Sequence, residues 1–158
     1  MSFFSSAHER LVRKFLSNGV DFVLIGGHAV VFYGVRRTTA DIDILVRPTL
    51  ENGTRILNAF KELELSIEDI LPDDFIKDQV FTFGMEPDAV DILNFSKGVS
   101  LEEIFANATT ARIDKLVLKI IDIKDLLKNK ENLNRSTEKN LVDQQDILAL
   151  QRILKSKN

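Results

Sequence analysis

The segment LIGGHAVVFYGVRRTTADIDILV, residues 24–46, constrains the fold more than any other part of the chain. An apolar run breaks at Gly26-Gly27 and resumes as far as Gly34. A basic, hydroxylated stretch then leads into Asp41-Ile-Asp43-Ile-Leu-Val46. This order predicts a buried strand, a glycine turn, a short helix, a polar loop and a second strand. Alternation along the second strand places Asp41 and Asp43 on one face.

Asp41 and Asp43 would repel each other, and burying both without a partner would be costly. A divalent cation removes that conflict, and carboxylate ligands favour Mg²⁺ or Mn²⁺. Proteins usually hold Mg²⁺ with one or two carboxylates plus substrate phosphates, so the pair indicates a phosphoryl or nucleotidyl substrate. The alternatives are a solvated strand face, or salt bridges from Arg36, Arg37 or Arg47.

A third carboxylate, Asp91, lies in a strand-like run that extends from Ala89 to Phe95. Strand alternation places Asp91 on the same face as Leu93 and Phe95, so that face is otherwise apolar. An acid in this setting is costly unless it is paired or binds a metal. The alternative is an ion pair with a lysine or arginine. Asp88 is a weaker candidate, because it lies in the predicted turn.

Phosphate-binding candidates surround the glycine turn. The backbone N–H groups at Gly26-Gly27 can approach a phosphate at the start of the following helix. Arg36 and Arg37 could bind phosphate as planar forks, or could equally be solvated loop residues. His28 could contact a nucleotide, although a histidine at the start of a helix is more often a capping or packing residue.

Apolar periodicity predicts further elements along the chain. Helices are predicted over residues 5–17, 27–33, 50–63, 100–106, 123–132 and from 136 onward, and strands over 20–25, 41–47, 79–83, 89–95 and 111–121. Residues 79–83 and 89–95 should form a hairpin. Thr49, Ser100, Asp122 and Ser136 are the expected N-caps of four of the helices. These elements indicate an α+β fold.

Length and composition limit the classes of protein to which the chain can belong. A chain of 158 residues fits one domain, residues 1–158, with a core over about 20–121 and C-terminal helices over about 122–155. The formal net charge of -3 does not favour a general nucleic-acid binder. With no cysteine, disulfides and thiolate-bound zinc are excluded. No signal peptide and no apolar run of roughly 20 residues is evident, so we expect a cytoplasmic protein without a membrane span.

The combination of Gly26-Gly27, Asp41-Ile-Asp43 and Asp91 resembles the DNA polymerase beta-like nucleotidyltransferase superfamily. The local sequence is similar to that of the small bacterial members of this superfamily, the AbiEii-like and MNT-like proteins associated with toxin–antitoxin systems. The similar residues are Gly-Gly-His-Ala-Val…Gly-Val-Arg-Arg-Thr-Thr-Ala-Asp-Ile-Asp. The segments 125–130 and 143–146, with Arg135 and Lys139, resemble the helical region that follows the catalytic core in that group. The resemblance covers about residues 20–150.

The resemblance implies a small mixed or antiparallel sheet flanked by helices, with a C-terminal helical segment. It implies that Asp41 and Asp43 bind the metal and that Asp91 completes the catalytic site and helps to activate the attacking hydroxyl. The implied nucleotide-binding residues are Gly26, Gly27, Arg36, Arg37, Thr39 and Lys130, with Lys128 and Lys139 as rivals of Lys130.

Two hypotheses about function follow from the resemblance. The first is a Mg²⁺- or Mn²⁺-dependent enzyme that transfers an NMP from an NTP such as ATP to a hydroxyl of a protein or RNA acceptor. The second is an antitoxin-like or regulatory protein that binds a toxin or antitoxin partner with little or no turnover. Three clustered acids favour the enzyme, and the small size favours the partner protein. The acceptor, the preferred NTP and the oligomeric state stay open.

Overall fold

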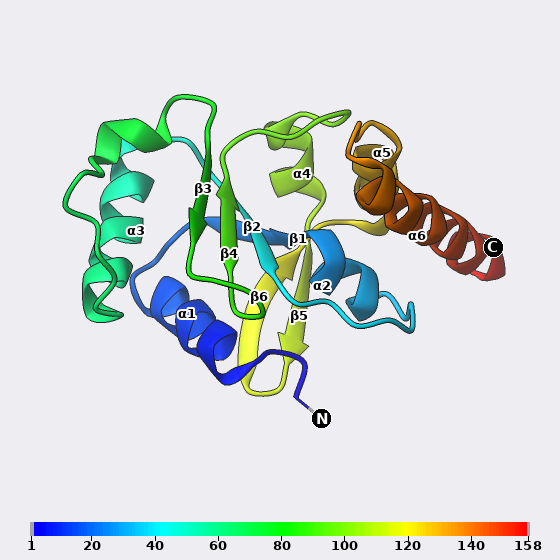
Figure 1. The fold of residues 1–158 in the computed structure, drawn as a ribbon, viewed down its shortest axis with the longest axis horizontal. Coiled ribbons are helices and arrows are strands. Elements are labelled where there is room, and N and C mark those ends of the chain that lie inside the picture. Colours follow the sequence, from blue (N-terminus) through cyan, green and yellow to red (C-terminus); the bar gives the residue numbers. More distant parts are fainter. Residues whose placement is uncertain (1, 158) are drawn as a thin grey trace.

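A six-stranded mixed sheet forms the centre of the computed structural model, which describes residues 2–157 (Figure 1). Its strands are β1 (Phe22–Ile25), β2 (Ile42–Val46), β3 (Val80–Phe83), β4 (Val90–Leu93), β5 (Thr109–Ile113) and β6 (Leu116–Ile120). They are arranged in the order β3-β4-β2-β1-β6-β5. β1 runs antiparallel to β2 and parallel to β6, and β2 runs parallel to β4. The predicted α+β class with a mixed sheet is confirmed.

Helices flank this sheet and extend beyond one side of it (Figure 1). They are α1 (Ser6–Ser17), α2 (Gly26–Phe32), α3 (Leu50–Glu62), the 3₁₀ helix η1 (Pro72–Phe75), α4 (Leu101–Asn107), α5 (Ile123–Glu131) and α6 (Thr137–Ser156). α5 and α6 pack against each other and form the expected C-terminal helical segment. No helix within residues 2–157 is both long enough and apolar enough to cross a membrane.

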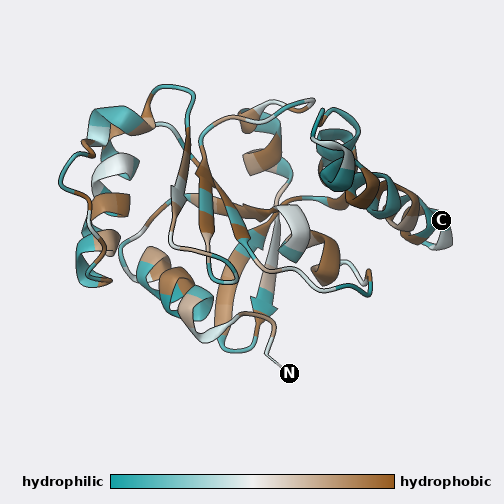
Figure 2. Cartoon of the chain, viewed as in Figure 1, coloured by the Kyte–Doolittle hydropathy of each residue, from teal (hydrophilic) through white to brown (hydrophobic). Residues whose placement is uncertain are grey.

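The buried apolar residues form a core between the central strands and the helices, and Figure 2 shows hydrophobic residues along these elements. All four residues of β1 are buried, as is most of β2. Phe15 of α1 contacts Phe22 of β1 and Phe60 of α3, with ring centroids 5.6 and 5.9 Å apart. These contacts fix α1 and α3 to the sheet. α2 packs on β1 and β2 and also reaches α5.

Local sequence signals explain where several helices begin. Thr49, Ser100 and Asp122 each accept a hydrogen bond from a backbone N–H two or three residues further along the chain, as N-caps do. These three predicted caps are confirmed. Ser136 precedes α6, but its side chain makes no capping hydrogen bond.

The prediction of one strand over residues 111–121 is wrong. The chain folds back there, and β5 and β6 pair as an antiparallel hairpin with Ile113 opposite Leu116. The reversal falls at Asp114-Lys115, where Asp114 adopts a left-handed φ of 55° that aspartate tolerates better than most residues. The turn contains no glycine, proline or asparagine, and Asp114 is its single turn-favouring residue, so the turn signal in the sequence is weak.

Gly53 provides a test of how α3 packs on η1. A Cβ at this position would lie 2.7 Å from the carbonyl oxygen of Pro72. Gly53→Ala should therefore lower the free energy of unfolding by about 1–3 kcal/mol, although alanine is normally favoured over glycine in a helix. Denaturant unfolding measures this change. Asn58→Ala on the exposed face of α3 is the control and should be neutral or slightly stabilising. A stabilised Gly53→Ala variant would contradict the packing.

Candidate active site

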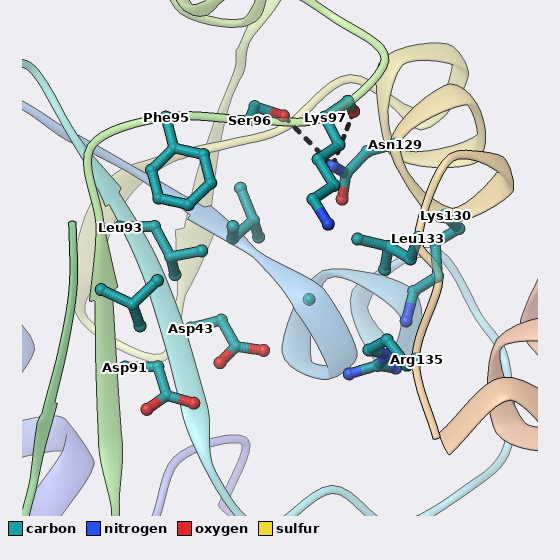
Figure 3. A pocket seen from close by; sticks show the side chains of 13 residues that line it. Asp43, Asp91, Leu93, Phe95, Ser96, Lys97, Asn129, Lys130, Leu133 and Arg135 are labelled. Carbon is teal, nitrogen blue, oxygen red and sulfur yellow. Dashed lines mark hydrogen bonds between the residues drawn. The ribbon is translucent and has the colours of Figure 1, made fainter. Parts of the chain in front are cut away.

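Asp43 and Asp91 lie side by side because β2 and β4 are parallel neighbours. The register pairs these two residues directly, and Figure 3 shows both carboxyl groups at the same wall of a cavity. Burial, and secondly the charge of Asp91, raises the pKa of Asp43 to about 7. Two adjacent carboxylates, one of them largely desolvated, make this position a strong attractor for a cation.

Asp41 immediately precedes β2 and is half-buried. Burial, followed by the charges of Glu86 and Asp91, raises its pKa. Its buried Oδ1 has no hydrogen-bond partner among residues 2–157. A buried carboxylate oxygen without a partner is costly, and a bound cation would satisfy it.

The salt bridges that were one alternative explanation for the acids are not found among the described residues. Within the described chain no ion pair joins the predicted arginines to Asp41 or Asp43, because Arg47 pairs with Asp21 and Arg37 pairs with Asp146. Asp91 accepts a hydrogen bond of 2.6 Å from the hydroxyl of Thr82 in place of the salt bridge that was the alternative. The carboxylates therefore face the cavity with their charges uncompensated by arginine or lysine contacts.

The three aspartates line one cavity of about 270 Å³. Among residues 2–157 no three acidic or histidine side chains stand close enough together to form a metal centre by themselves. The adjacent pair, the raised pKa values and the orphaned oxygen of Asp41 nevertheless fit a divalent cation. Asp43 and Asp91 are the paired residues that would hold it, and Asp41 lines the same cavity.

The two glycines are required by close contacts at this wall. Gly26 has a left-handed φ of 67°, and a Cβ there would lie 2.1 Å from Oδ2 of Asp43. A Cβ at Gly27 would lie 2.3 Å from Oγ1 of Thr39. Within the described residues no side chain caps the start of α2. The missing side chains thus let Asp43 and Thr39 approach the backbone at the start of α2.

Cationic side chains from the C-terminal segment form the opposite wall (Figure 3). Lys130 and Arg135 line the cavity together with Asp43 and Asp91. Their charges counteract the rise in the pKa of Asp43, which shows their electrostatic proximity. Lys139 also lines this cavity. Lys128 and Arg36 are exposed and line neither this cavity nor its neighbour.

A second cavity of about 280 Å³ adjoins the first and shares four lining residues with it: Asp43, Asp91, Lys130 and Arg135. Its remaining walls are largely apolar and include Ile25, Val80, Leu93, Phe95 and Leu133. The first cavity is more polar, with Gly27, Arg37, Thr38, Thr39, Asp41 and Lys139 along it. We call the first cavity the polar compartment and the second cavity the apolar compartment. The shared acids and cations lie where the two compartments meet.

His28 does not belong to either compartment. It is buried and stacks on Phe4, with Phe3 and His8 against its ring. Burial, followed by the charge of His8, lowers its pKa to about 4, so the ring is neutral. The structure thus favours the packing role of His28 over nucleotide contact.

Three residues have a place at the site that the sequence patterns did not indicate: Thr82, Asp143 and Asp146. Thr82 carries no signal until the strand register places it opposite Asp91. Asp143 and Asp146 share a face of α6 because they are three residues apart, and both are buried. This spacing of acids on a helix was the available clue.

Comparison with known proteins agrees with this arrangement at the level of the fold. No family profile matches the chain, and no curated protein sequence matches it significantly. A proposed nucleotidyltransferase from Thermotoga maritima aligns over 95% of this chain and 86% of its own, at 12% identity and a TM-score of 0.55. An antigenic nucleotidyltransferase-like protein from Paracoccidioides brasiliensis aligns over 89% of this chain and 71% of its own, at 16% identity and a TM-score of 0.56.

The lincosamide antibiotic adenylyltransferase LnuA, solved with lincomycin bound, aligns over 95% of this chain and 98% of its own, at 14% identity and a TM-score of 0.57. None of these three structures is described as AbiEii-like or MNT-like, so that subfamily assignment stays a prediction. The chain has the nucleotidyltransferase fold.

Gly26 and Gly19 together test the close approach of Asp43 to the glycine turn. Both have a left-handed φ, 67° and 69°, but a Cβ at Gly19 would meet its nearest atom, Nε of Arg55, only at 3.9 Å. Gly19→Ala therefore measures backbone strain alone, and Gly26→Ala adds the clash with Asp43. We expect Gly26→Ala to lose about 1–3 kcal/mol more unfolding free energy than Gly19→Ala. Equal losses in denaturant unfolding would show that Asp43 does not occupy this space.

Proposed function

We propose that this protein is a metal-dependent nucleotidyltransferase that transfers an NMP from an NTP to an acceptor hydroxyl. The observation that carries the proposal is the paired register of Asp43 and Asp91, which face Lys130 and Arg135 across one cavity. Such a site offers acids for a cation and cations for phosphates within the same space. The nucleotidyltransferase fold supports the same assignment.

In this proposal Asp41, Asp43 and Asp91 hold Mg²⁺ or Mn²⁺. When bound, the ion supplies positive charge that binds and orients the phosphates of the NTP. Asp91 also stands where it can accept the proton of an attacking hydroxyl, since its carboxylate borders both compartments.

The nucleotide would be held by the other residues around the polar compartment. Lys130 contributes a buried positive charge, which would form charge-assisted hydrogen bonds to the phosphates. Gly26 and Gly27 admit the nucleotide close to the backbone at the start of α2. Thr39 and Arg37 line the same compartment, and Arg36 lies on the same loop at the surface.

For the acceptor we propose a hydroxyl of a protein or RNA. The fold neighbour LnuA carries the name of an enzyme that modifies a small antibiotic, so hydroxylated small molecules belong in the same test. The second hypothesis, a partner-binding protein with little turnover, is favoured by one observation. Leu141 and Leu148 of α6 are 60% and 54% exposed, as apolar side chains at a contact surface would be.

Label transfer tests the enzyme hypothesis directly. The protein is incubated with each α-labelled NTP and Mg²⁺ or Mn²⁺, and in separate reactions with total RNA, candidate partner proteins or a mixture of hydroxylated small molecules. We expect label to reach one acceptor class and to depend on the divalent ion. Asp41→Ala and Asp43→Ala should reduce transfer at least a hundredfold, because each removes a negative charge that attracts the cation. Transfer that survives both substitutions would refute the metal assignment.

Thr82 provides a milder test of the role of Asp91. Thr82→Val keeps the shape of the side chain but removes the hydroxyl that donates to Asp91. The carboxylate then loses its orientation, and we expect kcat to fall about threefold to tenfold. Thr82→Ser restores the hydroxyl and should retain most of the wild-type rate. If the valine and serine variants have the same kcat, the hydrogen bond does not position Asp91.

A further inference from the structure

A buried ion cluster links α6 to the candidate active site. Its two anions are Asp143 and Asp146, which we call the α6 carboxylate pair. Its three cations come from other segments: Arg37 from the loop between α2 and β2, Lys130 from α5, and Arg135 from the connection between α5 and α6. The cluster is thus a point at which four separate segments of the chain meet.

Each acid of the pair holds two cations. Asp143 accepts hydrogen bonds from Nε of Arg135 at 2.7 Å and from Nζ of Lys130 at 3.2 Å. The Arg135 hydrogen bond and the Lys130 charge outweigh the effect of burial and lower the pKa of Asp143, so it stays ionised.

Asp146 binds Arg37, the remaining cation of the cluster, and also Lys130. Nε and Nη2 of Arg37 reach its two carboxylate oxygens at 2.9 and 3.0 Å, as a planar fork. Nζ of Lys130 lies 3.1 Å from Oδ2 of the same residue. Lys130 is therefore shared between both acids of the α6 carboxylate pair.

The cations of this cluster border the cavity, and its anions do not. The side chains of Asp143 and Asp146 are only 1% exposed and line neither compartment, whereas all three cations line the polar compartment. Three cations against two anions leave one net positive charge. Lys130 has three N–H donors and Arg135 has five, so both retain donors beyond those that the acids use.

Fold stability alone gives a weak reason for such a cluster. Taking charges out of water is costly, and well-packed apolar residues at the same positions are often as stable as a buried ion network. What an apolar replacement cannot do is present positive charge to the wall opposite Asp43 and Asp91. The positive charge of the cluster lies where it would stabilise a bound polyanionic substrate.

We propose that Asp143 and Asp146 are positioning residues, which hold Lys130, Arg135 and Arg37 at the cavity wall to receive the phosphates of the substrate. α6 is then a part of the site as well as a support for α5. This inference rests on the proposed function. Neither acid touches the substrate itself, and their effect passes through the cations.

Asp143→Asn and Asp146→Asn test this role, with Asp125→Asn as the matched control. Asp125 is also a buried aspartate in the C-terminal segment, but its partner is the neutral Asn107 at 3.2 Å and it lines neither compartment. The full-length protein is titrated with a non-hydrolysable NTP and Mg²⁺, and separately with inorganic triphosphate. Circular dichroism and thermal unfolding verify that each variant is folded at the assay temperature.

We expect both cluster variants to bind the NTP and triphosphate about tenfold more weakly, because misplaced cations lose charge-assisted hydrogen bonds to phosphate. In turnover the loss should appear mainly as a raised KM for the NTP. Asp125→Asn should bind as the wild type does even if its melting temperature falls. Wild-type affinity in both cluster variants, or an equal loss in the Asp125 variant, would overturn the positioning role.

Arg135 keeps the test decisive if the buried variants do not fold. Its side chain is 36% exposed, and Asp143 keeps Lys130 as a partner when Arg135 is replaced, so we expect Arg135→Gln and Arg135→Lys both to fold. Lysine retains the charge but cannot form the fork to Asp143, so its triphosphate affinity should lie between those of glutamine and the wild type. Unchanged affinity in both would overturn the proposal.

The outcomes also separate this inference from the proposed function. A wild-type protein that binds NTP but transfers no label would refute the enzyme and leave the positioning role standing. A wild-type protein that binds neither NTP nor triphosphate would overturn both.

Discussion

The parallel pairing of β2 with β4 is the constraint on which the site depends. It places Asp43 beside Asp91 in direct register, and burial raises the pKa of Asp43 to about 7. Like charges held this close need a cation or a proton. The backbone hydrogen bonds of the sheet hold the two strands in this register, so the repulsion cannot relax by sliding one strand past the other. The sheet therefore holds two acids together at one point of its surface, where a positive charge would stabilise them.

The C-terminal segment places positive charge on the opposite wall of the cavity. α5 and its connection to α6 bring Lys130 and Arg135 to the wall opposite the acids (Figure 3). Asp143 of α6 pairs with both of these cations, and Asp146 pairs with Lys130. The site is therefore divided between an acidic sheet and a basic helical wall. A phosphate chain with a divalent ion is complementary to both walls, because the ion can meet the acids while the phosphate oxygens meet the cations.

Much of the candidate site could be predicted from sequence because its parts carry local signals. Asp41 and Asp43 share a strand face by alternation, and the Gly26-Gly27 break marks a turn by composition alone. Other parts have no local signal. Thr82 is placed beside Asp91 only by the register of β3 with β4. The turn at Asp114-Lys115 is marked by a single turn-favouring residue, Asp114. Arg37 was expected to be free for phosphate or solvent, whereas tertiary packing bonds it to Asp146.

The sequence by itself determined the α+β class and most helix and strand positions, and it pointed to the three acids as candidate site residues, since these follow from periodicity, capping and the cost of burying charge. Only the tertiary structure decided which residues oppose the acids. It joined Lys130 and Arg135 to them, assigned His28 to packing, and drew Asp143 and Asp146 into the ion cluster. The physical reason is range: propensity and alternation act between near neighbours, whereas electrostatic partners are selected by strand register and helix packing between distant segments.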